Sequence, residues 1–323
     1  MTRIDARPLR LHDFEPQLDD FCAQVIAGLR KPQKELPCKF FYDREGSILF
    51  DQICALDEYY PTRTELSIMR ENIDEMCAVI GERCMLVEYG SGSSLKTRTL
   101  LENLGDVSAY VPIDISRSHL LSAARTLANK YPIEVLPVCA DYTADFELPT
   151  PETDVDSTVV YFPGSTIGNF EPSAARAFLH TARLRAGTGS GMLIGVDLKK
   201  DPQRLHAAYN DAKGITAKFN LNLLARINRE ADGDFDLSQF AHYAFYNPLV
   251  GRIEMHLMSL QDQVAHVANK AFDFREGETI FTESSYKYTV DEFAALARDS
   301  GYLVQHVWTD PQKLFSVQYL ASL

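Results

Sequence analysis

Five short apolar runs alternate with stretches of helical periodicity, and this alternation limits the fold more than any other feature of the chain. The runs cover residues 85–89, 109–113, 133–138, 158–162 and 192–196, and each stops at or near a glycine or an aspartate. Helical spacing fills the intervals at 95–104, 119–128 and 172–184. Buried strands that alternate with helices predict an α/β fold, with a parallel sheet covered on both faces.

The segments that flank this alternation extend the predicted sheet domain. Apolar residues at spacings of three and four predict one helix over residues 64–80. Near the other end, a predicted helix at 290–298 stops at Gly301 and is followed by strands at 302–308 and 314–320. The turn at 310–313 joins these two strands, so we expect a terminal antiparallel hairpin.

The stretch from about residue 199 to 287 interrupts this rhythm. It begins with two helical patterns, at 201–211 and 215–229, and continues with alternating strands at 240–246, 252–260, 264–268 and 279–287. Helices followed by strands, without alternation between them, predict an α+β lobe inserted before the final hairpin.

The charge balance restricts the kind of partner. The chain of 323 residues carries 32 basic and 45 acidic side chains, a formal net charge of −13. A field of that sign repels phosphate backbones and anionic membranes, so we expect a small diffusible substrate, with neither nucleic acid nor membrane as a partner.

The cysteines and the N-terminus indicate the compartment. None of the six cysteines forms a C-x-x-C pair, and a chain of this length does not need disulfides for stability, so buried free thiols are expected. Residues 1–16 contain no apolar core of a signal peptide, and no apolar run approaches the roughly 20 residues of a membrane helix. We therefore predict a cytoplasmic protein.

A glycine-rich turn follows the first predicted strand, in the segment Val87-Glu88-Tyr89-Gly90-Ser91-Gly92-Ser93-Ser94-Leu95-Lys96-Thr97. Ligands of open α/β sheets bind at the carboxyl ends of such strands. Both the dinucleotide motif G-x-G-x-x-G and the P-loop require glycine where this chain has Leu95. A nucleoside cofactor without a pyrophosphate, such as S-adenosylmethionine, tolerates both departures.

Polar residues at the ends of the next strands fit the same cofactor. Asp114 closes the second strand, where a carboxylate accepts hydrogen bonds from both ribose hydroxyls. Asp141 and Tyr142 close the third strand, where the acid would accept from the adenine amine and the ring would cover the base. Lys96, in the first turn of the following helix, would meet the carboxylate of the methionine moiety.

A serine hydrolase is the weaker alternative. Residues 164–168 resemble the nucleophile elbow G-x-S-x-G, but Thr166 stands at the nucleophile position. The motifs H-E-x-x-H and C-x-x-C are both absent from the sequence, so no metal is expected.

Several unusual segments resemble one known family over nearly the whole chain. They are K-F-F-Y-D at 39–43, F-D-Q-I at 50–53, E-Y-Y-P-T-R-T-E at 58–65, G-S-T-I-G-N at 164–169, R-I-E-M at 252–255 and T-E-S-S at 282–285. Together they are similar to the histidine-specific Nα-methyltransferases of ergothioneine biosynthesis. The resemblance implies that S-adenosylmethionine methylates the α-amine of L-histidine three times, giving hercynine, in a monomeric enzyme.

The resemblance also implies a domain division and a set of site residues. A Rossmann-type methyltransferase domain would comprise residues 61–198 and 287–323, and a substrate-binding domain residues 1–60 and 199–286. Positions that match the family's cofactor site are Gly90, Lys96, Asp114, Asp141 and Tyr142. Positions that match its histidine site are Tyr59, Asn169, Tyr209, Glu283, Ser284 and Ser285, and those that match its pocket lining are Tyr42, Phe50, Gly164 and Met255.

The chemistry of these side chains suits histidine. Glu283 and Ser285 are two apart in a predicted strand, so both point to one face, where a carboxylate takes the imidazole N–H and a hydroxyl serves the other nitrogen. Asn169 and Tyr209 would hold the substrate carboxylate as neutral donors, because a cationic group there would repel a product that carries a fixed positive charge. On pattern alone Met255 is expected in the core rather than in the pocket, because it shares a strand face with Ile253 and Leu257.

The proposed reaction is direct transfer to the neutral amine. No strong base is evident, and positioning supplies most of the catalysis, with Tyr59 or Tyr42 passing the proton to water. Two alternatives remain open at this stage: an Nα-methyltransferase of another amino acid, such as an aromatic one, and a non-catalytic S-adenosylmethionine-binding protein.

Overall fold

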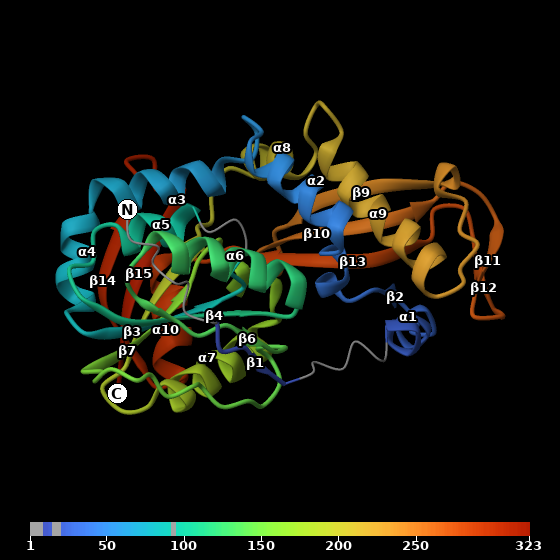
Figure 1. The fold of residues 1–323 in the computed structure, drawn as a ribbon. Coiled ribbons are helices and arrows are strands. Elements are labelled where there is room, and N and C mark those ends of the chain that lie inside the picture. Colours follow the sequence, from blue (N-terminus) through green and yellow to red (C-terminus); the bar gives the residue numbers. More distant parts are fainter. Residues whose placement is uncertain (1–8, 15–20, 92–94) are drawn as a thin grey trace.

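The computed structural model describes residues 9–14, 21–91 and 95–323. The chain forms a large mixed sheet flanked by helices and a second lobe built on a smaller sheet, which lie side by side in Figure 1. None of the helices in the described part of the chain is both long and apolar enough to cross a membrane.

The main sheet contains the predicted parallel strands. β3 (Cys84–Tyr89), β4 (Val107–Asp114), β7 (Ser157–Phe162) and β8 (Gly191–Asp197) run parallel in the order β4-β3-β7-β8. The order reverses direction at β3, since the chain runs outward to β4 on one side and to β7 on the other. Such a switch point opens a crevice at the carboxyl ends of the strands, which is where α/β sheets bind ligands.

Helices cover both faces of this sheet, and the side chains of β3 show why. Met85, Val87 and Tyr89 belong to a core cluster with α7 (Pro172–Ala186) and α10 (Val290–Asp299). Cys84 and Leu86 point the other way, into a cluster with α3 (Tyr60–Glu71), α4 (Ile73–Ile80), α5 (Leu95–Leu101) and α6 (Arg117–Lys130). A strand that is buried on both faces is predominantly apolar, as the sequence indicated, and the one acid of β3, Glu88, is buried with its carboxylate accepting from the Thr97 and Tyr110 hydroxyls.

The predicted terminal hairpin is confirmed. β14 (Tyr302–Thr309) and β15 (Phe315–Ser322) pair antiparallel, and β15 also pairs antiparallel with β8. α10 before it begins with a capping box, in which Thr289 and Glu292 satisfy each other's backbone N–H groups.

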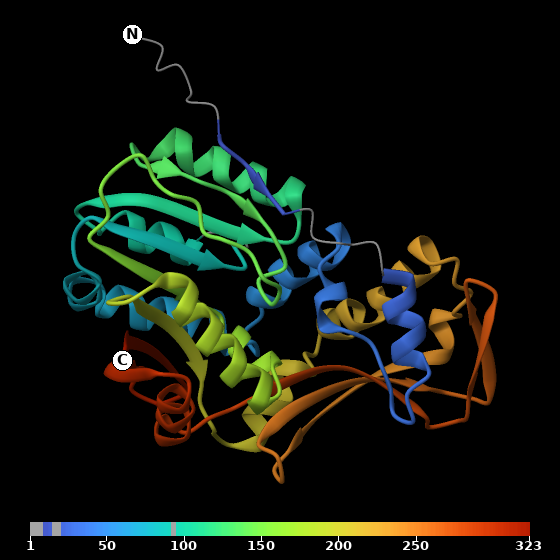
Figure 2. The same ribbon diagram turned by 90° about the horizontal axis from the view of Figure 1, so that it is seen from below.

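The second lobe has its own sheet, in the order β2-β13-β10-β9. β9 (Phe240–Asn247), β10 (Arg252–Ser259) and β13 (Thr279–Tyr286) are antiparallel, and β2 (Lys34–Glu35) adds to the edge of β13. A separate core joins this sheet to α1 (Phe21–Leu29), α2 (Arg44–Cys54), α8 (Pro202–Tyr209) and α9 (Ile215–Glu230). Figure 2 shows β13 leading from the lobe back to α10 beside the main sheet.

Three predictions about elements were wrong in detail. The helix expected over 64–80 breaks at Asn72 into α3 and α4, where the backbone leaves the helical region with φ −123° and ψ 19° and the side-chain amide donates to the Ile68 carbonyl at 2.8 Å. The third strand is split into β5 (Glu134–Val135) and β6 (Val138–Cys139) around Pro137, which has no N–H for the ladder. β12 (Lys270–Phe274), the hairpin partner of β11 (Gln263–Val267), was not predicted.

Short elements near the N-terminus were also not anticipated. β1 (His12–Asp13) extends the main sheet beside β6, and the 3-10 turn Cys38–Phe41 leads into α2. Asp43 caps α2 by accepting from the Gly46 N–H at 2.7 Å. This turn brings residues 37–42 to the crevice of the main sheet, which is where the candidate site lies.

Candidate active site

A cavity of about 490 Å³ occupies the crevice at the carboxyl ends of β3 and β4. Gly90, Asp114, Lys96 and Tyr142 line it, as do residues of the N-terminal segment that includes Cys38. Four of the five predicted cofactor residues therefore surround one space. Gly92, Ser93 and Ser94 of the glycine-rich turn lie outside the described residues.

Gly90 and Asp114 shape the floor of this cavity. Gly90 has a φ of 77°, a left-handed conformation that only glycine adopts without strain, and its N–H donates to the Ile113 carbonyl at 2.9 Å. The Asp114 carboxylate accepts from the Ser116 N–H at 2.8 Å, and burial raises the pKa of this carboxyl. A buried acceptor that lines a cavity suits a ligand that brings hydroxyl donors.

Tyr142 and its neighbour Asp141 take different positions. The Tyr142 ring lines the cavity and packs in a cluster with Tyr89, Phe162 and Phe178, at centroid distances of 5.8, 6.0 and 5.9 Å. The Asp141 side chain is not among the groups that line the cavity. Its carboxylate accepts from the Thr143 N–H at 2.9 Å and lies 3.4 Å from the Lys39 ammonium.

Lys96 has a partner that the sequence analysis missed. Its ammonium donates to the carboxylate of Glu65, which is 1% exposed and also accepts from the Gly164 N–H at 3.0 Å. Gly195 makes room for this carboxylate, because a Cβ at that position would lie 2.3 Å from Glu65 Oε1. The sequence offered a signal, since Glu65 lies one helical turn before the buried Met69.

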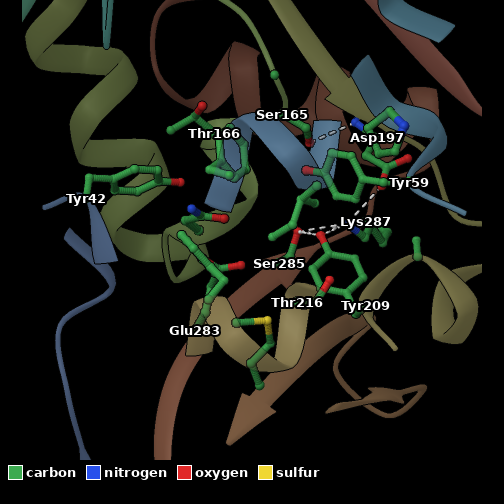
Figure 3. Close-up of a pocket in the computed structure, with 18 residues that line it drawn as sticks. Tyr42, Tyr59, Ser165, Thr166, Asp197, Tyr209, Thr216, Glu283, Ser285 and Lys287 are labelled. Carbon is green, nitrogen blue, oxygen red and sulfur yellow. Dashed lines mark hydrogen bonds and ion pairs between the residues drawn. The ribbon is translucent and has the colours of Figure 1, made fainter. Parts of the chain in front are cut away.

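A second, smaller cavity of about 60 Å³ adjoins the first, toward the second lobe. Both cavities share part of their lining, namely Tyr42, Phe50, Tyr59, Pro61, Gly164, Thr166 and Asn169. The smaller cavity also has Tyr209, Met255, Glu283 and Ser285 in its wall. Nine of the ten residues assigned to the substrate pocket or to catalysis are thus brought together, and Figure 3 shows the labelled members of this set around one space.

Ser284 is the exception. Strand alternation turns its side chain away from Glu283 and Ser285, and its hydroxyl donates to the Asn169 carbonyl at 3.5 Å. Ser284 therefore contacts the backbone of a residue that lines the cavity, without lining the cavity itself.

Glu283 faces Met255 across the β10–β13 pair, in the wall of the smaller cavity. Burial raises the pKa of the Glu283 carboxyl to about 7, and the positive charge of Lys287 opposes that rise. A carboxylate held at this cost in a cavity wall is poised to accept a hydrogen bond from a ligand N–H.

The sequence analysis also missed a buried ionic cluster, of which Asp197 and Lys287 belong to the wall of the smaller cavity. Lys287, which is 2% exposed, donates to Asp197 at 2.8 Å, to Ser285 Oγ at 2.7 Å and to the Tyr209 hydroxyl at 3.1 Å. Asp197 accepts in turn from Lys200 at 2.6 Å and from the Tyr60 hydroxyl at 2.8 Å.

Lys287 corrects one expectation. Only neutral groups were expected at the end of the pocket that was predicted to hold the substrate carboxylate. A lysine lies there, and its charge is paired with Asp197. Burial works against ionisation of Asp197, but Lys287 and Lys200 lower the pKa of its carboxyl overall. The sequence carried a signal, since 283, 285 and 287 share one face of the predicted strand.

Aromatic rings enclose the smaller cavity on the side that adjoins the larger cavity. Tyr42 packs against Phe50 at 5.6 Å and against Phe219 at 5.9 Å, and Phe50 lies 6.4 Å from Tyr59. Phe219 from α9 was not predicted as a site residue. Ring faces stabilise cations, so this group suits a ligand that carries a positive charge.

The switch-point crevice, its buried acid and its aromatic cover suit a cofactor that carries an adenosine group, as S-adenosylmethionine does. The chain belongs to the histidine-specific, S-adenosylmethionine-dependent methyltransferase family, whose sequence profile matches residues 21–322.

Curated relatives agree with this assignment. The histidine N-alpha-methyltransferase of Mycolicibacterium smegmatis is 43% identical over 294 residues, which cover 89% of this chain and 90% of the relative. The protein of the same name from Mycobacterium tuberculosis is 39% identical, covering 92% and 93%. Ergothioneine biosynthesis protein 1 of Neurospora crassa is 32% identical over 88% of this chain, which spans only 33% of that longer relative.

Proposed function

We propose that this protein transfers three methyl groups from S-adenosylmethionine to the α-amine of L-histidine, giving hercynine in the first step of ergothioneine biosynthesis. The observation that carries the proposal is the pairing of Glu283 and Ser285 on one wall of a small cavity that adjoins the cofactor-sized one. Imidazole has two nitrogens that need partners, and an acid beside a hydroxyl provides both. The names of the relatives with 43% and 39% identity support the same substrate.

S-adenosylmethionine fits the larger cavity by its chemistry. Asp114 offers a buried acceptor for the ribose hydroxyls, Tyr142 offers a ring face for the adenine, and Lys96 offers a cation for the amino-acid tail. When bound there, the cofactor supplies an electrophilic methyl group on a sulfonium. Asp141 would lie at the rim of the adenine site, where Thr143 and Lys39 hold its carboxylate.

Histidine would lie in the smaller cavity with its amine toward the shared wall. Asn169 and Tyr209 would hold its carboxylate, with Ser284 supporting the Asn169 backbone. Gly164, without a side chain, leaves room between the two cavities, and Met255 packs beside Glu283. Proximity of this kind is worth several orders of magnitude in rate.

The residues shared by the two cavities would hold the neutral α-amine toward the larger one, where the bound cofactor would supply the methyl group. An α-amine whose pKa stays near its ordinary value of about 8 has a useful neutral fraction at cytosolic pH. Burial raises the pKa of the Tyr59 hydroxyl well above its usual value, so Tyr59 remains a phenol that relays the amine proton to water without ionising. Tyr42 has the same proposed role from the opposite side.

The trimethylated product carries a fixed positive charge. The rings of Tyr42, Phe50, Tyr59 and Phe219 would face it and stabilise the charge as it grows.

The same proposal divides the chain by function. Residues 61–198 and 287–323 would bind the cofactor, and residues 1–60 and 199–286 would bind the substrate. Separate cores under the main sheet and in the second lobe support this division. A monomeric state and a cytoplasmic location are retained as predictions from the sequence.

A time course with purified protein, S-adenosylmethionine and L-histidine tests the proposal. Mass spectrometry should detect mono- and dimethylhistidine as intermediates and trimethylhistidine as the end point. If S-adenosylmethionine binds and histidine gains no methyl group, the protein is either a binder or a methyltransferase for another amino acid, and the proposal fails.

A further inference from the structure

We propose that Lys287 is a positioning residue that directs the Tyr209 hydroxyl toward the substrate carboxylate and makes that end of the cavity select for carboxylate-bearing amines. The proposal rests on the proposed histidine substrate and extends it to a further residue in the wall of the smaller cavity. Figure 3 shows Lys287 beside Tyr209 and Ser285, on the side away from Tyr42.

Lys287 acts through other side chains. An ammonium has three N–H donors, and those of Lys287 have three partners: Asp197, Ser285 and Tyr209, at 2.8, 2.7 and 3.1 Å. With these donors engaged and 2% of the residue exposed, Lys287 has no donor left for a ligand. Its influence on a substrate must pass through the two hydroxyl groups.

One hydrogen bond joins the two hydroxyls. In the structure Tyr209 donates to Ser285 Oγ at 2.9 Å and both oxygens accept from Lys287, so one O–H spans the gap and the other is left for the cavity. A substrate carboxylate has no hydrogen to give, so it selects the arrangement in which Tyr209 donates outward and Ser285 donates to Tyr209. The adjacent ammonium polarises this chain and strengthens the outward donor.

This arrangement assigns Ser285 the acceptor role toward the imidazole. Glu283 and Ser285 then both act as hydrogen-bond acceptors for the imidazole ring. A ring that is protonated on both nitrogens, with one of these protons shared with Glu283, donates to both of them. The hydroxyl that serves the second nitrogen is thereby coupled, through Lys287, to recognition of the carboxylate.

The charge balance favours a carboxylate at the same end. Asp197, which is fully buried, is shared between Lys287 and Lys200, so these three side chains carry two positive charges and one negative charge. Lys200 contacts Asp197 and Tyr60 but neither Tyr209 nor Ser285, which makes it the matched control. Glu283 lies across the cavity from this cluster, as Figure 3 shows.

The experiment compares L-histidine with histamine, which keeps the imidazole and the amine but lacks the carboxylate. Dissociation constants are measured calorimetrically, with S-adenosylhomocysteine present, for the wild type, Lys287→Met and Lys200→Met. The wild type should bind histidine more tightly than histamine. Lys287→Met should weaken histidine binding roughly 10- to 100-fold, the range expected for hydrogen bonds that involve a charged group, and histamine binding by less than about threefold.

Two results would overturn the proposal. One is an equal loss of affinity for histidine and histamine in Lys287→Met, which would indicate a structural role only. The other is a change in the histidine-to-histamine affinity ratio in Lys200→Met that equals the change in Lys287→Met. If Lys287→Met does not fold, as judged by loss of S-adenosylhomocysteine binding, Tyr209→Phe should show the same selective loss, and a retained preference there would refute the role. Failure of the wild type to bind or methylate histidine would instead refute the proposed function.

Discussion

Glu283→Gln is the substitution whose effect on stability follows most directly from the site. The folded protein holds the pKa of this carboxyl at about 7, against an ordinary value of 4.5. Between these values the unfolded chain is ionised while the folded protein keeps the proton, so stability is lost as the pH rises. A tenfold difference in proton affinity between the folded and unfolded states corresponds to about 1.4 kcal/mol. The Glu283 carboxyl therefore lowers the free energy of unfolding by about 3 kcal/mol at pH 8 and by about 1 kcal/mol at pH 5.

Glutamine has nearly the same shape and cannot ionise. We therefore expect Glu283→Gln to be more stable than the wild type by about 3 kcal/mol at pH 8, with the advantage shrinking to about 1 kcal/mol at pH 5. Urea unfolding without ligands, followed by circular dichroism at both pH values, measures the difference. Glu276, an exposed glutamate, provides the matched control Glu276→Gln, which should follow the wild type.

The reasoning is refuted if the stability difference between Glu283→Gln and the wild type is the same at pH 5 and pH 8. The proposed function adds a second expectation, because the more stable variant should bind histidine less well. A gain in stability with unchanged histidine affinity would separate the buried acid from substrate recognition.

Three further substitutions test other parts of the site. Gly195→Ala places a Cβ 2.3 Å from Glu65 Oε1, so urea unfolding should show a loss of about 1–3 kcal/mol, and unchanged stability would contradict the packing described. Asp114→Asn removes a charged acceptor, and calorimetry should find S-adenosylhomocysteine binding roughly 10- to 100-fold weaker. Tyr59→Phe should slow the methylations in single-turnover mass spectrometry, and unchanged rates for all three would remove Tyr59 from the proton relay.

The sheet was predictable because its cause is local. Strands that are buried on both faces are mostly apolar, and β3, β4, β7 and β8 each carry a continuous apolar run that is recognisable without reference to the rest of the chain. The break at Asn72 was not visible in the hydrophobic pattern, since α3 and α4 continue the same apolar spacing on either side of it. The backbone angles of Asn72 and its side-chain hydrogen bond to the Ile68 carbonyl reveal the interruption.

The site was predictable to the extent that residue type alone implies a role. Strand periodicity places Glu283 and Ser285 on one face, but the family resemblance is what marked them as site residues, and their roles remain predictions. Glu65 and Lys287 were not assigned, because their contacts with Gly164 and with Tyr209 and Asp197 join segments distant in sequence. Asp141 has a residue type and a strand-end position that suit the cofactor site. Its carboxylate nevertheless contacts Thr143 and Lys39 beside the cavity.

A competition assay tests the central claim most directly. The protein is incubated with S-adenosylmethionine and an equimolar mixture of the twenty amino acids, and all products are identified by mass spectrometry. The account predicts histidine with three added methyl groups and no other methylated amino acid. Methylation of a different amino acid while histidine stays unmodified would contradict it, and would place the error in the roles assigned to Glu283 and Ser285.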